Sequence, residues 1–373
     1  MRDQLRQMFH AGIAACHPGT VLPRHLPAER PQAVLAIGKA AGAMAKVAEA
    51  HWPGIGGIAV VPHGWDAELA KIELLHADHP VPDEASVAAA ERLLALAESG
   101  GALVLLSGGA SALACLPGDG LSLAEKQAIT LTLLRAGATI SEINCVRRHL
   151  SRIKGGRLPA ALTLAISDVF GDRPEDIGSG PTVADPTTVA DARAILELHG
   201  LDAPLTESPK QVPGEFRLVA SAADLLAAAA AEAERLGYRP VLLGQCTGEA
   251  RTIGTAHAEI ARRLSPRSAL VSGGELTVAV TGTGRGGPNL EYALAAAACL
   301  ADRPDIHGLA ADSDGLDGNS GAAGAFFSGA DAAGAGMLDA NDSAAWFASA
   351  GGLFSPGPTG TNVNDLRIIL VAP

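Results

Sequence analysis

The chain has 373 residues, of which 48% are hydrophobic and only 3% aromatic, so it is long enough to form two sizeable cores. Its formal net charge of −12 argues against a nucleic-acid-binding protein, because no basic surface is available for a phosphate backbone. No uncharged stretch approaches the roughly 18 residues of a membrane span, which argues against a membrane protein.

Five cysteines are odd in number, widely spaced and without a C-x-x-C pair. They predict neither a disulfide framework nor a thiolate zinc site, and they favour a reduced cytoplasm. Residues 1–16 mix charges into an apolar pattern, so we expect an amphipathic first helix and no secretory signal. Beyond it, apolar runs alternate with alanine-rich helical patterns, which favours an α/β fold.

An apolar run at residues 33–37 predicts a buried strand that ends in Gly38 and Lys39. A helix should follow, to about residue 49. A lysine in the first turn opposes the helix dipole, which hints at an anion nearby. The alternative is a surface lysine whose stem lies along apolar neighbours.

The strand predicted at residues 102–106 leads directly into a loop of small hydroxyl residues and glycines. Doubly wound sheets place phosphates at such a carboxyl end. It is not a Walker motif, because the Gly-Lys-Ser/Thr ending is missing. The candidate phosphate ligands in this loop are Ser107, Gly108, Gly109 and Ser111.

Ser122 and Glu125 form a capping-box pattern, which predicts a helix to about residue 137. Residues 144–157 predict a cation-rich helix, most of whose charges could form a solvated face. Lys154, which precedes two glycines, is the candidate phosphate ligand of that stretch.

The buried strand predicted at residues 162–166 delivers Asp168 at its carboxyl end, before a long glycine- and proline-rich loop. That position makes Asp168 a candidate site residue. The alternative is a helix or loop cap.

Residues 204–214 are proline-rich and polar, and they are the best linker candidate. A β-α-β-α run at residues 216–265 follows and could pack on either half. We therefore expect an N-terminal Rossmann-like domain at residues 1–213, with about 265 as an alternative end, and a smaller domain at residues 266–373.

Anion-handling and metal-handling residues lie together between residues 272 and 319. A strand at 277–280 should enter a glycine loop, and Pro288 opens a helix whose free N–H groups could face an anion. Arg285 adds a fork matched to phosphate or carboxylate. The loop residues selected for phosphate binding are Gly284 and Gly286, and the candidate Mg²⁺ ligands are Asp312, Asp314 and Asp317.

Three functions fit these patterns. Gly282-x-Gly284-x-x-Gly287, with Asp312 about 25 residues later, approaches a dinucleotide fingerprint and would suit a dehydrogenase. Several glycine loops, two lysines, an arginine and aspartates in both halves suit phosphoryl transfer. A sugar- or nucleotide-sensing module would also use such glycine loops, but it has less need for so many acidic residues. A calcium loop fails on spacing, since Leu316 and Ala323 occupy positions that need oxygen ligands.

A resemblance to a known family covers nearly the whole chain. Its motifs, in order, are IGKAAGAM, LLSGGASAL, NCVRRHLSRIKGGRL, SDVFGD with IGSGPT, GEAR, SGGE, GRGGPN, DSDGLDG and GPTGTNVNDL. Together they resemble the bacterial glycerate 2-kinase family with a C-terminal MOFRL domain, also labelled hydroxypyruvate reductase. The resemblance implies an α/β fold with a large doubly wound domain, a smaller MOFRL domain and a cleft between them.

The resemblance also implies ATP-dependent phosphorylation of D-glycerate at its 2-hydroxyl, with Mg²⁺, giving 2-phosphoglycerate. It places Lys39, Asp168, Arg285 and Asp314 on the motifs that carry the proposed catalytic groups. Lys39 and Arg285 would neutralise the glycerate carboxylate and the transferring phosphoryl group. One of Asp168 and Asp314 would orient or deprotonate the hydroxyl, and the other would hold Mg²⁺ with Asp312 or Asp317.

The expected partners are a small hydroxy acid and a nucleotide, without nucleic acid or membrane, and a homodimer is among the oligomeric states left open. The chain departs from the family pattern at three places: Pro288 to Leu290, Asn319 to Gly321, and Gln245 to Thr247. These changes remove a cation and two carboxylates next to predicted site residues. These departures affect the identity of the substrate more than they affect the fold.

Overall fold

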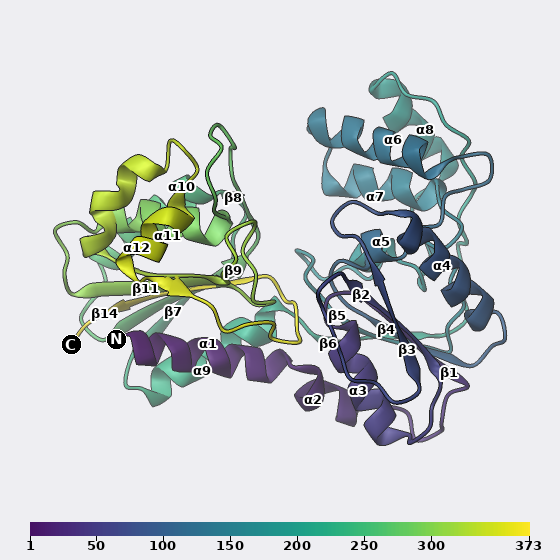
Figure 1. Cartoon of the computed structure of the whole chain (residues 1–373), viewed down its shortest axis with the longest axis horizontal. Helices are drawn as coiled ribbons and strands as arrows, with labels where there is room; N and C mark the ends of the chain where they lie inside the picture. The colour runs from purple at the N-terminus through teal and green to yellow at the C-terminus, as the bar shows by residue number, and fades with distance from the viewer. The chain divides into compact units, whose positions relative to one another are not determined.

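The computed structural model describes residues 1–373, and they form two compact units (Figure 1). We call Val21–Val219 the central unit. Met1–Thr20 and Ala220–Pro373 form the terminal unit, which holds both chain ends. The run at residues 216–265 lies almost entirely in the terminal unit. The first helix also packs there, although it was expected in the N-terminal domain.

The central unit is built on a six-stranded sheet with the order β3-β2-β1-β4-β5-β6. Neighbours from β3 to β5 pair in parallel. In doubly wound folds of this order, ligands bind where the order reverses, outside the carboxyl ends of the two strands concerned. Here that point lies between β1 and β4. The strands are β1 (Ala33–Ile37), β2 (Gly57–Pro62), β3 (Ile72–Ala77), β4 (Ala102–Leu106), β5 (Leu162–Ile166) and β6 (Glu215–Ala220).

Helices cover this sheet, so its inner strands are buried along their whole length. Their sequences are therefore continuous apolar runs. Figure 1 shows α6, α7 and α8 gathered at one end of the unit, where they share a small apolar core of their own. The helices are η1 (Leu22–Arg24), α3 (Ala41–His51), α4 (Glu84–Ala97), α5 (Ala110–Leu113), α6 (Leu123–Arg135), α7 (Ile140–His149), η2 (Ile177–Ser179) and α8 (Val189–Leu198), with α2 (Pro18–Val21) at the unit boundary.

The terminal unit contains a second six-stranded sheet, of mixed direction, with the order β13-β12-β11-β14-β9-β7. Only β7 and β9 pair in parallel; β14, β11, β12 and β13 are antiparallel to their neighbours. The strands are β7 (Arg239–Gln245), β9 (Ser268–Gly274), β11 (Ile306–Asp312), β12 (Gly324–Ser328), β13 (Leu353–Phe354) and β14 (Asp365–Val371), and a separate pair is formed by β8 (Gly248–Glu249) and β10 (Leu276–Thr277).

Helices lie on both faces of the terminal sheet, with α1 and α9 on one face and α10, α11 and α12 on the other (Figure 1). Because β7, β9 and β11 end, and β14 begins, at one edge, the loops there come from distant parts of the sequence. The helices are α1 (Arg2–Cys16), α9 (Ala222–Arg235), α10 (Ala250–Arg262), α11 (Pro288–Cys299), η3 (Gly329–Met337) and α12 (Ser343–Ala350).

Three local predictions differ from the structure. The helix expected to reach residue 157 ends at His149, and residues 150–157 form bends and turns. The strand expected at 277–280 is reduced to the two-residue β10, because the following residues turn away into a loop. The predicted linker does not form a loose connection: Ser208 is buried, and its hydroxyl donates to Asp185 Oδ2 at 2.7 Å.

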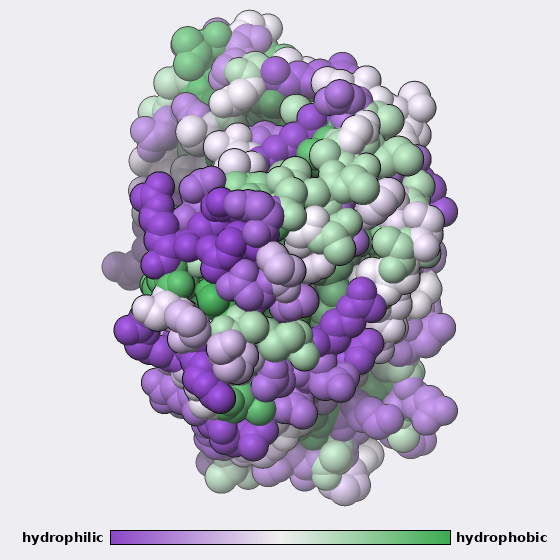
Figure 2. Space-filling view, turned by 90° about the vertical axis from the view of Figure 1, so that its left-hand side faces the viewer, coloured by the Kyte–Doolittle hydropathy of each residue, from purple (hydrophilic) through white to green (hydrophobic).

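No helix in the structure combines the length and the apolar character that a membrane span requires. The face seen in Figure 2 intersperses hydrophilic residues with small, pale apolar areas, and dark green side chains occur there only in small groups.

Candidate active site

Two loops of the central unit interlock at the reversal point of its sheet. The Lys39 amide donates to Gly108 O at 2.8 Å, and the Ala40 amide donates to Ser107 Oγ at 3.0 Å. Gly38 has a φ of +127°, and a Cβ there would lie 2.2 Å from Ser107 Oγ. Only glycine fits this position, so the β1 and β4 loops hold each other in place. Lys39 precedes α3 and is half-buried.

Gly109 lies between two side chains that could contact a ligand. Its φ is +83°, and a Cβ there would lie 3.1 Å from His79 Cδ2 and 3.5 Å from Lys39 Cγ. His79 follows β3, whose carboxyl end lies at the same edge of the sheet as those of β1 and β4. His79 was not among the predicted site residues, although its place just after a parallel strand was a usable signal.

A chain of polar side chains supports the other end of the same loop. Ser111 Oγ lies 2.9 Å from Ser179 Oγ, and the Ser179 hydroxyl donates to Asn144 Oδ1 at 3.1 Å. The Asn144 amide donates to Asp176 Oδ1, also at 3.1 Å. Motifs that lie far apart in the sequence, at residues 144–158 and 177–182, therefore meet behind the loop and fix its position.

Lys154 has a structural contact where a phosphate contact was expected. Its Nζ donates to Ser111 O at 2.7 Å and to Ala114 O at 3.1 Å, which are carbonyls at the end of α5. The side chain is buried, and this burial lowers its pKa to about 7, with nearby Lys126 and Arg147 acting in the same direction. Lys154 thus stabilises the end of α5, which follows directly on the candidate phosphate loop at residues 107–111.

We expect the stability of the protein to rise with pH through this lysine. The unfolded lysine, with a pKa of about 10.4, binds more protons than the folded one between pH 7 and 10, so the free energy of unfolding increases over that window. Urea unfolding at pH 7 and 9 should show a smaller increase for Lys154→Met than for the wild type. The same change at exposed Lys46 is the control, and equal slopes for all three proteins would contradict the expectation.

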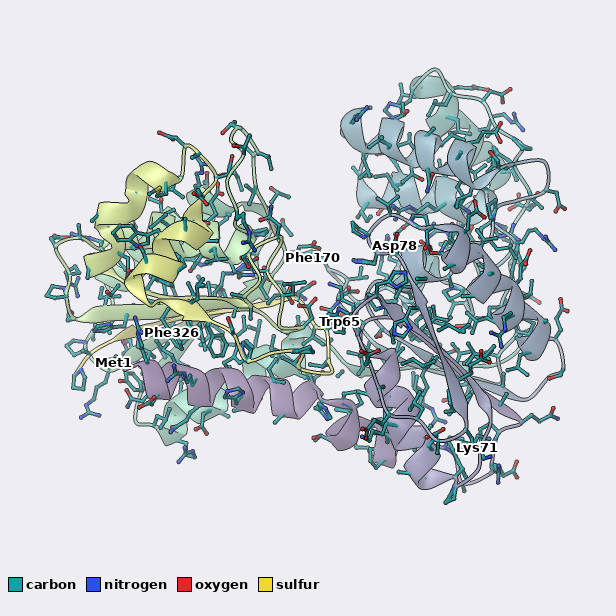
Figure 3. The ribbon with its side chains drawn as sticks, in the orientation of Figure 1. Met1, Trp65, Lys71, Asp78, Phe170 and Phe326 are labelled. Atoms are coloured by element: carbon teal, nitrogen blue, oxygen red, sulfur yellow. The ribbon has the colours of Figure 1, made fainter.

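Asp168 lies two residues beyond β5, which pairs with β4, so both strands deliver their loops to the same edge. It is half-buried, and the neighbouring amide of Val169 donates to Ser167 Oγ at 3.2 Å. Phe170, two residues further on, is 62% exposed (Figure 3). The central unit therefore brings the Lys39 loop, the Ser107 loop and Asp168 to one edge, as their positions after strands predict.

The glycine loop of the terminal unit contacts the chain's own residues. A Cβ on Gly282 would lie 2.2 Å from Ala340 O, and one on Gly284 would lie 2.4 Å from Asp342 Cβ. A Cβ on Gly286 would meet Ser343 Oγ at 2.6 Å. These glycines were expected to leave space for a ligand. The segment at residues 340–343 fills that space instead.

Arg285 is exposed on this loop, and its guanidinium donates to carbonyl oxygens. Its Nε and Nη2 donate to Asn319 O at 3.3 and 3.2 Å, and Nη2 lies 3.4 Å from Ser320 O. These bonds tie the glycine loop to the aspartate loop. Carbonyl oxygens do not neutralise the positive charge of the guanidinium, as a site for an anionic ligand requires.

Asp317 occupies the helix end that was expected to hold a bound anion. Its Oδ1 accepts from the Asn289 amide at 3.1 Å, and its Oδ2 accepts from the Leu290 amide at 2.9 Å, in the first turn of α11. The carboxyl group is buried, and burial raises its pKa to about 7. The group at this helix end is therefore a carboxyl of the chain itself, and Asp317 serves as a cap.

Replacing Asp317 with alanine should destabilise the protein by about 1–3 kcal/mol, because buried N–H groups lose their acceptor. Urea unfolding measures the loss, and Asp317→Asn, which keeps an acceptor, should recover part of it. Asp339→Ala, at a site whose side chain is 95% exposed, is the matched control. A variant Asp317→Ala as stable as this control would contradict the capping role.

A group of carboxylates remains where β11 ends and β14 begins. Asp312 pairs with Asp365 across the two strands, and the Asp314 amide donates to Asp312 Oδ1 at 2.9 Å. Asn289 Nδ2 donates to Asp365 Oδ1 at 2.7 Å. Burial raises the pKa of Asp365, and Arg367 opposes that rise. Asp365 and Asn289 were not among the predicted site residues, since their link to the aspartate loop depends on strand pairing.

The three predicted metal ligands do not form a compact triad. The one group of at least three His, Cys, Asp or Glu side chains whose ligand atoms lie within 4.8 Å of one another is His63, Asp78 and Asp83, at the exposed ends of β2 and β3 (Figure 3 labels Asp78). Asp83 is engaged there as the N-cap of α4. In the terminal unit, the oxygen donors of Asp312 and Asp314 suit Mg²⁺, which commonly takes one or two carboxylates and completes its shell with phosphates and water.

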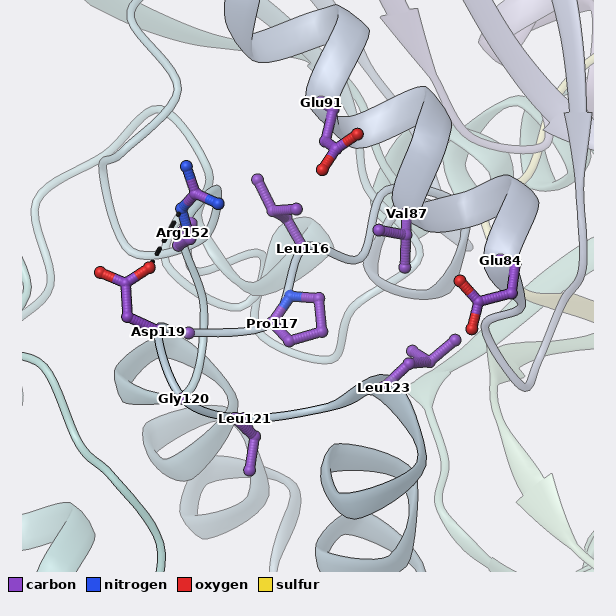
Figure 4. Close-up of a pocket in the computed structure, with 11 residues that line it drawn as sticks. Glu84, Val87, Glu91, Leu116, Pro117, Asp119, Gly120, Leu121, Leu123 and Arg152 are labelled. Atoms are coloured by element: carbon purple, nitrogen blue, oxygen red, sulfur yellow. Dashed lines mark ion pairs between the residues drawn. The ribbon is translucent and has the colours of Figure 1, made fainter.

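A pocket of about 340 Å³ lies elsewhere in the central unit (Figure 4). Its walls come from α4 and the segment around residues 116–123, and Arg152 lies 3.6 Å from Asp119 on its rim. None of the predicted site residues lines this pocket, so it is separate from the loops described above.

Two family models match separate regions of the chain. Residues 4–212 match a family described as a domain of unknown function, DUF4147, and residues 268–365 match the MOFRL family. A protein of Agrobacterium vitis named as a hydroxypyruvate reductase is 43% identical, over 99% of this chain and 94% of that protein. A D-glycerate 2-kinase of Thermotoga maritima is 37% identical, over 98% of this chain and 97% of that protein.

The crystal structure of glycerate kinase from Thermotoga maritima superimposes with a TM-score of 0.89 at 36% identity, covering 100% of this chain and 99% of that chain. Likeness in fold, in sequence and in the order of the two matched regions thus extends over the whole chain. The chain belongs to the glycerate 2-kinase family with a C-terminal MOFRL domain.

Proposed function

We propose that the protein transfers the γ-phosphoryl group of ATP to the 2-hydroxyl of D-glycerate and forms 2-phospho-D-glycerate. The observation that carries this proposal is the interlocked pair of loops at the reversal point of the central sheet, where the Lys39 amide bonds Gly108 O at 2.8 Å. A phosphate is held in such a place by backbone N–H groups and a nearby cation. The relatives named above as glycerate kinases support the choice of acceptor.

In the central unit, we assign the loop from Ser107 to Ser111 to phosphate binding and Lys39 to charge neutralisation on the transferring group. Asp168 is the candidate to orient the glycerate hydroxyl and accept its proton, because a carboxylate performs this task in phosphoryl transfer. Lys154 acts indirectly, since its bonds to Ser111 O and Ala114 O hold the loop in shape.

In the terminal unit, we assign Arg285 to an anionic group of a substrate, since its guanidinium fork matches a phosphate or carboxylate. Asp312 and Asp314 would hold Mg²⁺, because both lie at the carboxyl end of β11 and offer hard carboxylate oxygen atoms. When bound, Mg²⁺ neutralises phosphate charge. We leave Asp317 out of the metal site because both of its carboxylate oxygens already accept helix N–H groups.

The contacts of the glycine loop weaken the dehydrogenase alternative. A dinucleotide fingerprint needs glycines that leave space for a pyrophosphate at a helix N-terminus. Here the space beside Gly282 and Gly284 is filled by residues 340–343, and Asp317 occupies the N-terminus of α11.

The proposal is tested with purified protein in two parallel assays. One contains D-glycerate, MgATP and a coupled readout of ADP, and the other contains hydroxypyruvate with NADH or NADPH. We expect ADP release that requires both glycerate and Mg²⁺, with no nicotinamide oxidation. Nicotinamide oxidation without ADP release would reject the kinase in favour of a reductase.

A further inference from the structure

Asn341 lies at the centre of the contacts that hold the glycine loop of the terminal unit. It is 6% exposed, and its φ of +52° is in the left-handed region. Its Oδ1 accepts from the Thr281 amide at 2.8 Å and from the Gly282 amide at 2.7 Å. We propose that Asn341 is a positioning residue, which fixes the glycine loop so that the Arg285 guanidinium meets the anionic group of a substrate. This inference rests on the role proposed above for Arg285.

The contacts of the Asn341 side chain need both ends of its amide. Its Nδ2 donates to Ala279 O at 3.2 Å and to Glu291 Oε2, also at 3.2 Å. The two backbone N–H groups of the loop need an acceptor, whereas this carbonyl and this carboxylate need a donor. Among side chains of this size only asparagine supplies both. Aspartate, alanine or glycine at this position would therefore lose part of the arrangement.

An ion pair anchors Asn341 in turn. Glu291 lies in the first turn of α11 and is 1% exposed, and Arg251 Nε donates to its Oε1 at 2.5 Å. Arg251 Nη2 also donates to Leu338 O, at the end of η3 and shortly before Asn341. Arg251 belongs to the GEAR motif, to which the proposed reaction assigns no role. The motif therefore contributes by holding the start of α11 and the segment at residues 338–341 together.

The neighbours of Asn341 in the chain hold the rest of the loop. The Gly284 amide donates to Ala340 O at 3.0 Å, and the Arg285 amide donates to Asp342 Oδ1 at 3.1 Å. The Ala344 amide donates to Arg285 O, also at 3.0 Å. Because these backbone groups bond to the chain itself, the loop offers a ligand chiefly the guanidinium of Arg285. A binding group is effective only where surrounding hydrogen bonds fix its place, and here the segment at residues 340–344 provides them.

Asn341→Gly removes the side chain but suits the left-handed backbone, so it tests the hydrogen bonds without adding strain. Steady-state kinetics with MgATP and D-glycerate compare it with Arg285→Met and with the double variant. We expect both single variants to raise the KM of the same substrate, by at least about fivefold, because the guanidinium is displaced or absent. In the double variant, the change at Asn341 should add less than about twofold, since it acts through a group already removed. An unchanged KM, additive effects, or effects on different substrates would overturn the proposal.

A rescue experiment separates positioning from a merely structural role. Asn341→Asp keeps the acceptor but turns a carboxylate toward that of Glu291, so it should raise the same KM. Adding Glu291→Gln supplies a donor on the other side and should recover part of the loss. Asp339→Gly, in the same segment and with a side chain that is 95% exposed, is the matched control and should keep the wild-type KM. A change that only destabilised the protein would lower the active fraction, and with it kcat, but not alter KM. A double variant no better than Asn341→Asp alone would contradict the arrangement.

Hydrogen exchange distinguishes a failure of this inference from a failure of the proposed function. Mass spectrometry should show faster exchange in the peptide at residues 279–286 of Asn341→Gly, because the Thr281 and Gly282 amides lose their acceptor. Peptides of the central unit are the internal control and should exchange as in the wild type. Faster exchange in a protein whose wild type has no kinase activity would support the hold of Asn341 on the loop and reject the kinase reaction. Unchanged exchange would overturn the positioning role, whatever the activity.

Discussion

Replacing Lys39 with methionine is expected to lower kcat for glycerate phosphorylation by about 10²- to 10³-fold, because one preorganised positive charge on the transferring group is lost. The substitution leaves in place the hydrogen bonds that the Lys39 amide and the Ser107 hydroxyl oxygen make between the two loops. Steady-state kinetics with saturating MgATP and D-glycerate measure the change, and circular dichroism checks the fold.

Lys39→Arg keeps the charge and should retain more activity than Lys39→Met. Lys46→Met, an exposed position on the helix after the loop, is the matched control and should behave as the wild type. A Lys39→Met enzyme whose kcat lies within about threefold of the wild type would remove this lysine from the catalytic machinery.

Replacing Asp314 with asparagine is expected to raise the Mg²⁺ concentration needed for half-maximal activity by on the order of ten- to a hundredfold, because a charged ligand becomes neutral. Asp314 is 1% exposed and adjoins Asp312 through a hydrogen bond of 2.9 Å. Magnesium titrations of activity at fixed ATP provide the measurement.

Asp168→Asn should behave differently, with kcat lowered by about 10²- to 10⁴-fold and the Mg²⁺ requirement unchanged, as loss of a general base predicts. Asp339→Asn, at an exposed site of the terminal unit, controls for the loss of one negative charge. If Asp168→Asn shifted the Mg²⁺ requirement while Asp314→Asn did not, the two roles would have to be exchanged.

Strand ends were the part of the site that the sequence predicted best. The apolar runs at residues 33–37 and 102–106 are β1 and β4 with the same bounds, and the glycines and serines after them lie at the reversal point of the sheet. This succeeds because a buried parallel strand has a continuous apolar signal. The carboxyl end of such a strand has a known place in the fold.

The hydrogen-bond partners that lie far away in the sequence could not be predicted. Lys154 has the charge of a phosphate ligand, but its acceptors are carbonyls of α5, about 40 residues earlier. Asp317 has the chemistry of a metal ligand, but it caps a helix that begins 29 residues before it, at Pro288. Residue type gives the chemical capacity of a side chain, whereas the contact that uses it depends on packing.

The glycine loop shows the same limit. Its spacing fits a dinucleotide fingerprint, yet the space that glycine creates is filled by residues 340–343, about 60 positions further along the chain.

The position of the new phosphate group tests the central claim most directly. Purified protein is incubated with D-glycerate, MgATP and enolase, which converts 2-phosphoglycerate to phosphoenolpyruvate and leaves 3-phosphoglycerate unchanged. We predict that the ultraviolet absorbance of phosphoenolpyruvate rises without addition of a phosphoglycerate mutase. A rise that appears only after the mutase is added would place the phosphate on the 3-hydroxyl, and no rise in either case would contradict the proposed kinase activity.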